Sequence, residues 1–407
     1  MKEKLYELIQ KQQEPLFAMA DQIHDDPEYD GEEYHASAML EDYLEQNGFQ
    51  VERGLENWPT AFRATWSQGD GGPRIGLLCE YDALRGLGHG CGHHMQGPCI
   101  CATAIALKEA GFENPFQLVV YGTPAEETRS AKVSMWELGY FRDMDVALMM
   151  HGGPDTCVDE KSLALTNYLV TFKGQGAHAA LAPEKGRSAL DALLLSFNGM
   201  EFLREHVRED TRMHYTIKET PGPANVVPAR AVGEFSLRSY SRDVLNDVCR
   251  RFEQIIQGAA LMADVEYEIV KEKSLDNKVP CYPLNEIIMD NAAACGAPGL
   301  APVRKKTGST DFGNVTNHMP GCCIRVKFVP TGTSSHTQAF VDAGKSQAAH
   351  DAILYGAKTL AGTACDLICQ PERSKSFGMR LSRPRPTRKR IIEKPNDKPR
   401  QKNFCRG

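Results

Sequence analysis

Hydrophobic residues recur at two spacings along the chain, and the two spacings predict different elements. Apolar positions three or four residues apart predict helices over 1–25, 33–47 and 96–110. Short buried apolar runs predict strands over 49–51, 61–66, 74–79, 117–122 and 146–150. Helices and buried strands that alternate in this way favour an α/β fold built around a mixed sheet.

The pattern changes near residue 166. We predict a strand over 168–172, a helix over 187–207, strands over 213–218 and 230–239, a helix that Ser241 caps and that runs to about 262, and an edge strand over 265–270. This β-α-β-β-α-β order is that of a ferredoxin-like unit. An α/β pattern then resumes and closes with a helix near 344–362. We therefore expect a discontinuous domain of residues 1–165 and 275–370, with residues 166–274 inserted as a smaller α+β domain.

Composition and charge narrow the class of protein. Hydrophobic residues make up 42% and charged residues 25%, which is ordinary for a soluble globular chain. No apolar run is long enough for a membrane span, and the charged N-terminal stretch has no signal core, so we expect a cytoplasmic protein. The net charge of −6 gives no reason to expect a nucleic-acid partner.

Residues 371–407 form a separate basic segment. They carry 13 basic and 3 acidic residues, a net charge of +10, which leaves −16 for the other 370 residues. Their five prolines and weak apolar periodicity predict a disordered tail. Such a tail could bind RNA or anionic lipid, or it could be an extension without a specific role.

The densest polar cluster runs from Glu80 to His94, between a predicted strand and a predicted helix. Thirteen cysteines without a secretory signal do not indicate a disulfide framework, and most lie in apolar stretches as buried thiols. Cys91 differs, because Gly92 lets the backbone turn so that Cys91 and His93 converge. A thiolate beside an imidazole suits a cation such as Zn²⁺.

Further candidate ligands follow other predicted strands. Glu126 and Glu127 come directly after the strand near 117–122, and adjacent carboxylates point in different directions, so that one can ligate a metal while the other acts as a base. His151 ends a third strand, and His336 precedes the last predicted helix. Since ligand sites in open α/β sheets gather at strand ends, we expect these side chains to converge.

The chain resembles the M20 family of metallo-amidohydrolases, within the aminoacylase/carboxypeptidase clan. The branch it resembles hydrolyses N-acyl amino acids, aminobenzoyl-glutamate and small dipeptides. The resemblance rests on GHGCGHH at 88–94, GTPAEE at 122–127, MMHGG at 149–153, GQGAHAALAPEKGRSALDA at 174–192, NVVPARAVGEFSLR at 225–238, GSTDFGNV at 308–315 and SSHTQAF at 334–340. It implies an α/β catalytic domain of the zinc-peptidase type, with an inserted ferredoxin-like dimerisation (lid) domain and a homodimer.

The resemblance also implies roles for single residues. It implies two divalent metal ions, Zn²⁺ first and Mn²⁺, Co²⁺ or Ni²⁺ as compatible alternatives, held by Cys91, His93, Glu127, His151 and His336. Glu126 matches the general base that deprotonates the metal-activated water, and His178 matches a residue that stabilises the oxyanion from the partner subunit. Asn225 and Arg238 would hold the carbonyl and carboxylate of the substrate.

These motifs predict a metal-dependent hydrolase that cleaves the amide bond of N-acyl amino acids or small dipeptides with a free carboxylate. His94 stands where relatives usually carry Asn or Asp, and Arg85 where they usually carry Pro; neither change removes an implied ligand. The alternatives are a metal-binding or regulatory protein without turnover, an RNA- or membrane-associating protein that acts through its tail, and a cysteine hydrolase that uses Cys91.

Overall fold

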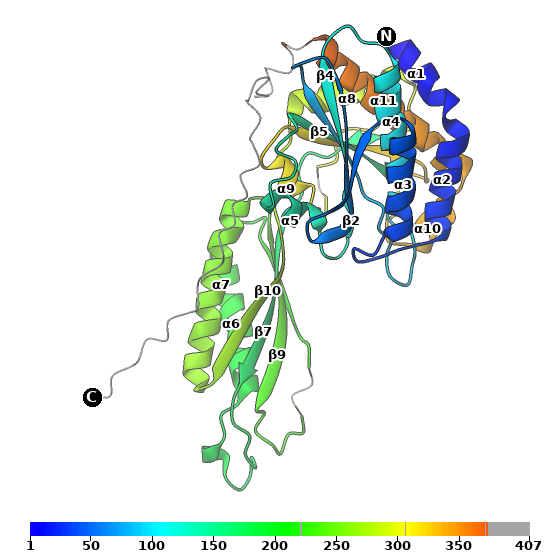
Figure 1. Cartoon of the computed structure of the whole chain (residues 1–407). Coiled ribbons are helices and arrows are strands. Elements are labelled where there is room, and N and C mark those ends of the chain that lie inside the picture. Colours follow the sequence, from blue (N-terminus) through cyan, green and yellow to red (C-terminus); the bar gives the residue numbers. More distant parts are fainter. Residues whose placement is uncertain (220–221, 306, 371, 373–407) are drawn as a thin grey trace.

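The computed structural model describes residues 1–219, 222–305, 307–370 and 372. The chain forms two parts, each built on its own sheet, and the smaller part extends away from the larger (Figure 1). The basic tail predicted over 371–407 lies outside the described residues, apart from residue 372.

The larger part is built on a seven-stranded sheet in the order β1-β2-β4-β3-β5-β11-β6. Its strands are β1 (Gln50–Leu55), β2 (Trp58–Gln68), β3 (Arg74–Cys79), β4 (Phe116–Gly122), β5 (Val146–Gly153), β6 (Cys157–Val158) and β11 (Gly321–Lys327). The four central strands, β4, β3, β5 and β11, run parallel, and antiparallel strands flank them at both edges. The mixed sheet predicted from the alternating pattern is confirmed.

Helices cover both faces of this sheet. They are α1 (Lys2–Lys11), α2 (Gln13–Asp25), α3 (Tyr34–Gln46), α4 (Gln96–Glu109), α5 (Ala131–Glu137), α8 (Tyr282–Ala294), α9 (Gly313–Thr316), α10 (Gln338–Asp342) and α11 (Gln347–Cys369), with a short 3₁₀ turn, η1 (His93–Met95). Along β5, Leu148 and Met150 pack into the core beneath α4 and α11, whereas Ala147 and Met149 pack into a second core beside α5 and α9. Because strand side chains alternate between faces, His151 follows Met149 onto the second face.

Contrary to the expectation that no stretch is long and apolar enough to cross a membrane, helix α11 is so by length and composition alone. In the folded chain, however, 78% of its most apolar window is buried, and it packs against α1, α4 and α8. It is therefore weak evidence for a membrane span, because the core helix of a globular protein has the same character.

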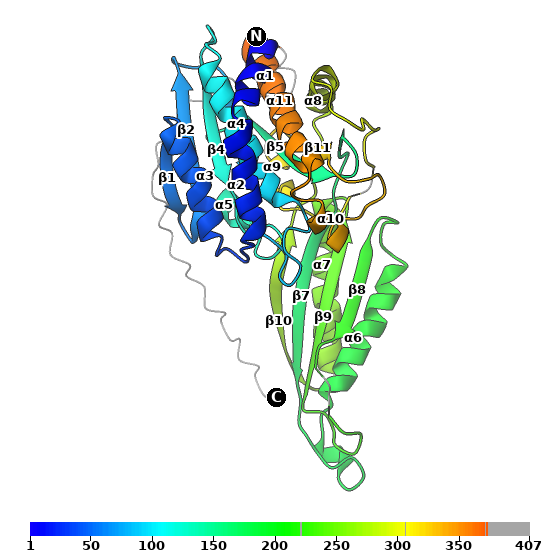
Figure 2. The ribbon, with the colours of Figure 1, turned by 90° about the vertical axis from the view of Figure 1, so that its right-hand side faces the viewer.

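The smaller part is a four-stranded antiparallel sheet in the order β10-β7-β9-β8, with two helices on one face (Figure 2). Its elements are β7 (Ala164–Lys173), η2 (Pro183–Lys185), α6 (Ala189–Arg204), β8 (Arg212–Ile217), β9 (Arg230–Ser239), α7 (Arg242–Ala263) and β10 (Glu266–Leu275). Ser188 and Ser241 cap α6 and α7 by accepting hydrogen bonds from the backbone N–H groups of Asp191 and Val244. The predicted β-α-β-β-α-β order and the predicted N-cap at Ser241 are confirmed.

No separate element was predicted for α5, α8, α9, α10, β6 or β11, and two predicted helical segments differ in detail. Residues 1–25 form two helices that meet at Gln12, because Pro15 lies in the first turn of α2 and has no N–H group with which to continue α1. The apolar residues of the helix predicted over 187–207 do not all face the core: Leu193 is buried, whereas Leu194 and Phe202 are 44% and 74% exposed.

Candidate metal centre and active site

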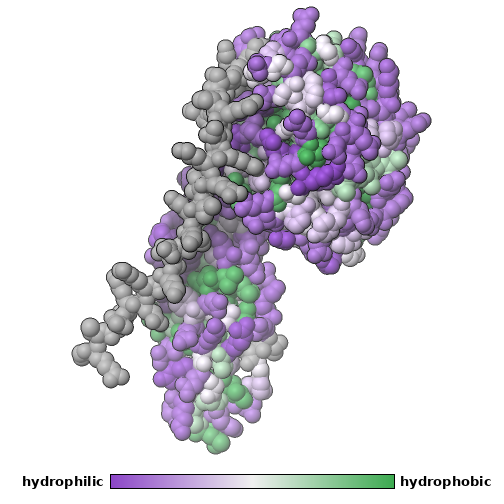
Figure 3. Space-filling model, in the orientation of Figure 1, coloured by the Kyte–Doolittle hydropathy of each residue, from purple (hydrophilic) through white to green (hydrophobic). Residues whose placement is uncertain are grey.

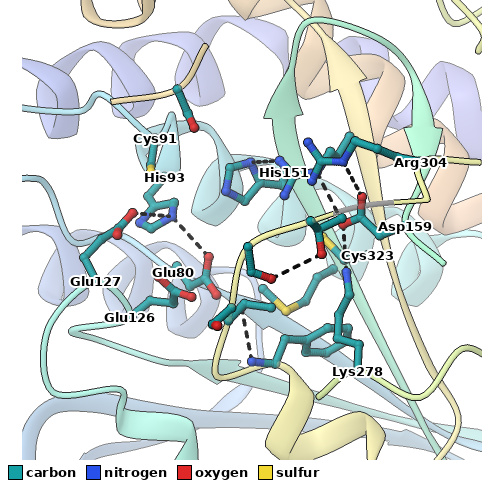
Figure 4. Close-up of a pocket in the computed structure, with 18 of the residues that line it drawn as sticks. Glu80, Cys91, His93, Glu126, Glu127, His151, Asp159, Lys278, Arg304 and Cys323 are labelled. Carbon is teal, nitrogen blue, oxygen red and sulfur yellow. Dashed lines mark hydrogen bonds and ion pairs between the residues drawn. The ribbon is translucent and has the colours of Figure 1, made fainter. Parts of the chain in front are cut away.

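A cavity of about 430 Å³ lies where the central parallel strands end. That volume is within the range of small-molecule sites. Its lining includes six residues singled out from the sequence: Cys91, His93, Glu126, Glu127, His151 and His336. His151 lies near the end of β5, the others follow β3, β4 and β11, and Figure 4 shows five of the six around one space. The convergence expected from their positions at strand ends is therefore observed.

Cys91 and His93 converge because Gly92 adopts a left-handed backbone with φ +78°. This conformation strains any residue with a Cβ atom, which here would also lie 2.9 Å from Cε of Met95 and displace that side chain. His336 lies in the segment that follows the inserted part in the sequence, and its backbone φ is +62°. Its Nε2 lies 2.8 Å from Sγ of Cys91. Burial, and then Glu127, raise the pKa of the Cys91 thiol well above its usual range.

Glu126 and Glu127 point in different directions, as predicted. Ala125 precedes them with φ +54°, a conformation that re-aims the chain directly after β4. Oε1 of Glu127 lies 3.9 Å from Nε2 of His93 and 3.5 Å from Nε2 of His336. Burial alone would raise the pKa of Glu127, but the hydrogen bond with His336 and the charge of His93 lower it to about 2. Burial, Glu80 and Glu127 instead raise the pKa of Glu126.

Both polar contacts of the His151 ring are made by Nδ1, which lies 2.7 Å from the carbonyl oxygen of Gly152 and 3.1 Å from Nη1 of Arg325. Within the described part of the chain Nε2 has no hydrogen-bond partner, so it is the ring atom available to a ligand. The ring of His151 packs edge-on against the ring of His93, with centroids 5.3 Å apart. Burial and the charge of Arg325 lower the pKa of His151 to about 3, so the ring is neutral at physiological pH.

These side chains fit a pair of divalent cations. Ligand atoms of Cys91, His93 and Glu127 lie within 4.8 Å of one another, and so do those of Glu80, His93 and His151. Imidazole, thiolate and carboxylate together form the donor set that Zn²⁺ and related ions accept. Burial disfavours a charge on His93, but Asp82 and Glu80 raise its pKa to about 10, so protons compete with a metal for this ring.

Two residues of the polar cluster that follows β3 support His93 and Glu127, and the sequence alone did not single them out. Asp82 accepts through Oδ1 from Nδ1 of His93 at 3.1 Å and through Oδ2 from the backbone N–H of Glu127 at 3.0 Å. Oε2 of Glu80 lies 3.3 Å from Nε2 of His93. Both carboxylates lie within the densest polar run of the chain, which is the signal that could have identified them.

A buried cation lies beneath the carboxylates of the site. Nζ of Lys132 on α5 donates to Glu80 at 2.6 Å and to Asp311 at 2.7 Å, and all three side chains are buried. Glu80, Glu126 and Asp311 form a third close group of carboxylates around the same region. Asp311 lies in the GSTDFGNV motif, but nothing in the sequence distinguishes Lys132 from an ordinary helix lysine.

Three of the residues predicted for the site do not line the cavity. His178 and Asn225 lie on the loops that follow β7 and β8, which meet through a bridge between His178 and Val226. These loops form the end of the inserted part farthest from the seven-stranded sheet (Figures 1 and 2). Arg238 lies in β9, where burial lowers its pKa and its Nε has no partner among the described residues.

The two departures from the family pattern have local explanations. His94 is buried and its Nε2 donates to the carbonyl oxygen of Gly344 at 2.8 Å, away from the ligand set. Arg85 pairs on the surface with Asp30 and stacks over Tyr29.

Comparisons with known proteins agree with this geometry. The sequence profile described as Peptidase family M20/M25/M40 matches residues 77–365. The chain is 32% identical to Xaa-Arg dipeptidase of Mus musculus over 91% of this chain and 90% of the relative. It is also 32% identical to one of the subunits of p-aminobenzoyl-glutamate hydrolase of Escherichia coli, over 86% and 88% of the two chains.

Solved structures share the fold. A dinuclear metal-binding peptidase of the M20 family from Bacillus subtilis superimposes with a TM-score of 0.65 at 18% identity, over 86% of this chain and 98% of that one. An aminobenzoyl-glutamate utilization protein from Klebsiella pneumoniae gives 0.70 at 19% identity, over 90% and 99%. The chain therefore belongs to peptidase family M20/M25/M40, a family of hydrolases that act on peptide and amide bonds.

Proposed function

We propose that this protein is a dinuclear metal-dependent amidohydrolase that releases an amino acid with a free carboxylate from an N-acyl amino acid or a small dipeptide. One observation carries the proposal. Glu126, a half-buried carboxylate with a raised pKa, lies directly beside a set of thiol, imidazole and carboxylate ligands in a single cavity. A base of this kind beside a metal centre is what amide hydrolysis at neutral pH requires.

The proposed ligands are Cys91, His93, Glu127, His151 and His336, with Zn²⁺ as the first candidate and Mn²⁺, Co²⁺ or Ni²⁺ as alternatives. When bound, such ions make water a nucleophile at neutral pH and polarise the carbonyl group of the substrate. Asp82 orients His93 and the backbone of Glu127 through the two oxygens of one carboxylate.

Glu126 performs the proton transfers. Its carboxylate takes a proton from the attacking water and gives it to the leaving amine, which must be protonated to depart. Burial and two neighbouring carboxylates raise the pKa of Glu126. Divalent cations bound beside it would lower the pKa again, which would leave the carboxylate ionised and able to accept a proton at neutral pH. Glu127, with its low pKa, stays ionised as a ligand, so the two adjacent residues divide the roles.

We further propose that residues 1–165 and 275–370 form the catalytic domain and that residues 166–274 pair two copies into a homodimer. His178 and Asn225 lie far from the cavity of their own chain, so they act on a substrate only if a partner brings them there. The inserted part offers an edge strand, β8, beside exposed Leu194 and Phe202 of α6. Figure 3 shows further hydrophobic patches on the other side of this part, where β10 and α7 face the viewer. An unpaired strand edge beside apolar side chains is a favourable pairing surface.

The substrate class has two candidates that differ in charge. One relative is named for dipeptides that end in arginine, and another for an amide of glutamate. Both substrates present an amide bond next to an amino acid with a free carboxylate, which fits the proposed roles of Asn225 and Arg238. The cytoplasmic location and the absence of a specific nucleic-acid partner stay predictions.

The test is amino-acid release from N-acyl amino acids, aminobenzoyl-glutamate and dipeptides, with Zn²⁺ or Mn²⁺ added, by wild type and by Glu126→Gln. We expect metal-dependent release by the wild type that Glu126→Gln abolishes, while the variant retains its fold and its metal. Wild-type rates in Glu126→Gln would overturn the mechanism. No release from any substrate, by protein shown to hold metal, would favour a binding or regulatory role.

A cysteine hydrolase is the alternative that involves the same cavity. It predicts inactivation by alkylation of Cys91 and no effect of chelators. The raised pKa of the Cys91 thiol argues against it, because the thiolate is the nucleophilic form. Chelator-resistant activity that iodoacetamide abolishes would nevertheless establish it.

A further inference from the structure

One wall of the cavity carries a cluster of cations around a single carboxylate. Asp159 is buried, and its Oδ2 accepts from Nζ of Lys278 at 2.7 Å and from Nε of Arg325 at 3.4 Å. Its Oδ1 accepts from Nε of Arg304 at 2.8 Å. We name these four residues the Asp159 cluster; Figure 4 shows Asp159, Lys278 and Arg304 across the cavity from Glu126 and Glu127.

The cluster belongs to the same space as the metal centre. All four of its residues line the cavity, and Nη1 of Arg325 lies 3.1 Å from Nδ1 of the proposed ligand His151. The side chains of Arg304 and Arg325 are 37% and 19% exposed, and both residues line the cavity, Arg304 being the more accessible of the two. A substrate held at the metal centre therefore lies within reach of them.

The cluster retains hydrogen-bond donors that the protein does not use. Within the described part of the chain, Asp159 engages only Nε of each arginine, and neither Nη atom of Arg304 has a partner. The hydroxyl of Ser309, which also lines the cavity, is buried and likewise has no partner among the described residues. Buried polar atoms without partners are uncommon, and a donor facing a cavity is satisfied when a ligand supplies the acceptor.

The net charge of the Asp159 cluster favours an anionic group of the substrate over a cationic one. Three cations and one carboxylate leave this wall with a net charge of +2, whereas the opposite wall carries the carboxylates that divalent cations would neutralise. A cationic side chain of a substrate would meet an aspartate whose two oxygens are already engaged by three cations. A carboxylate would instead meet unused guanidinium N–H groups, which match its two oxygens.

We propose that the Asp159 cluster, with Arg304 at its accessible edge, is a subsite for a second carboxylate of the substrate, so that the amino acid released is dicarboxylic, glutamate or aspartate. This inference rests on the proposed function and decides between its two charge classes. Asp159 acts as a positioning residue, because it fixes both arginines through Nε and leaves their Nη groups directed away from itself.

The kinetic test compares isosteric substrates. N-acyl-glutamate and N-acyl-glutamine differ in the charge of one terminal group, and N-acyl-arginine reverses that charge. We expect wild-type kcat/KM to favour glutamate over glutamine by about 10-fold or more, as the loss of a charge-assisted hydrogen bond implies. Arg304→Met should reduce this glutamate-to-glutamine ratio toward one, whereas Lys305→Met, which removes an exposed cation one residue away, should leave the ratio as it is.

A binding measurement separates this proposal from the proposed function. Glutarate, a dicarboxylate, and butyrate, a monocarboxylate, are titrated by calorimetry into metal-loaded Glu126→Gln protein and into the same protein with Arg304→Met. We expect glutarate to bind more tightly than butyrate and Arg304→Met to remove the difference, even if no substrate is turned over.

Each outcome decides the proposal. Equal kcat/KM for glutamate and glutamine substrates, or a preference for arginine, would overturn the subsite and leave the amidohydrolase intact. Glutarate binding that depends on Arg304 in a protein that hydrolyses nothing would retain the subsite and overturn the proposed function. If glutarate binds no better than butyrate and nothing is hydrolysed, both fail.

Discussion

Nζ of Lys132 lies 2.6 Å from Oε1 of Glu80, and neither side chain is accessible to solvent. The same ammonium group contacts Asp311 at 2.7 Å, so one buried cation compensates two carboxylates beneath the metal centre. Burial disfavours charge on all three groups, yet Lys132 lowers the pKa of Glu80, and Asp311 and Glu80 raise that of Lys132. Burial still raises the pKa of Asp311, although Lys132 opposes the shift. Glu80 and Lys132 therefore stay charged because they lie together.

Replacing Lys132 should accordingly cost much of the stability of the fold. In metal-free protein, Lys132→Met leaves two buried carboxylates without their cation, and we expect a loss of about 3–5 kcal/mol in the free energy of unfolding. Urea denaturation measures it. Adding Glu80→Gln to Lys132→Met should recover part of the loss, because one unpaired charge is then removed. A Lys132→Met protein as stable as the wild type would show that these ion pairs contribute nothing to the free energy of unfolding.

Asp82 should control metal affinity without being a ligand. Asp82→Asn replaces one acceptor oxygen by an NH₂ group, so the variant can no longer accept from both Nδ1 of His93 and the N–H of Glu127. We expect metal affinity to fall by about 10–100-fold, as for other residues that orient a metal-bound histidine. Competition with a chromogenic chelator measures it. Asp70→Asn, on an exposed loop, is the matched control. An equal loss of metal affinity in both variants would show that Asp82 does not act by orienting His93.

Glu33 should make stability depend on pH. The side chain is buried, accepts from the backbone N–H of Gly31 at 2.9 Å, and burial raises its pKa to about 7. The folded state therefore binds a proton that the unfolded state releases near pH 4.5. Its contribution is fully present below pH 4.5 and is lost as the pH rises to 7, by on the order of 3 kcal/mol.

Glu33→Gln removes this titration. The free energy of unfolding of the variant, relative to that of the wild type, should therefore rise between pH 4.5 and 7 and stay constant above pH 7. Urea denaturation at a series of pH values measures the difference. Glu32→Gln, at an exposed neighbouring position, should follow the wild type at every pH. Parallel pH profiles for Glu33→Gln and the wild type would contradict the prediction.

Local patterns were sufficient to predict the parts of the fold that local chemistry decides. The apolar run of β3, the cap at Ser241 and the turn at Gly92 each depend on residues within a few positions, and each is observed as predicted. The location of Cys91, His93, Glu127 and His151 at strand ends also follows, because parallel strands deliver their carboxyl ends to one edge of a sheet.

Contacts between distant segments could not be predicted in this way. Arg325 faces His151 because β5 and β11 pair in parallel register, and β11 was not assigned from the sequence. Lys132 meets Asp311, and Asp159 meets Lys278, across more than a hundred residues of chain. Nothing near a buried lysine or arginine in the sequence reveals that its partner lies on another strand or loop.

The last prediction concerns which protomer of the proposed dimer supplies His178. Since His178 lies outside the cavity of its own chain, Glu126→Gln and His178→Ala should each be nearly inactive as homodimers, by loss of the base and of the oxyanion donor. If the two variants are unfolded and refolded together, half of the dimers carry one of each. One of the two sites in such a dimer then combines an intact Glu126 with an intact His178 of the partner subunit. We expect about a quarter of the wild-type activity to return.

Mixing without refolding should restore none of it in a stable dimer, and sedimentation of each preparation verifies that dimers are present. Activity that stays absent in verified mixed dimers would mean that His178 does not act across the dimer.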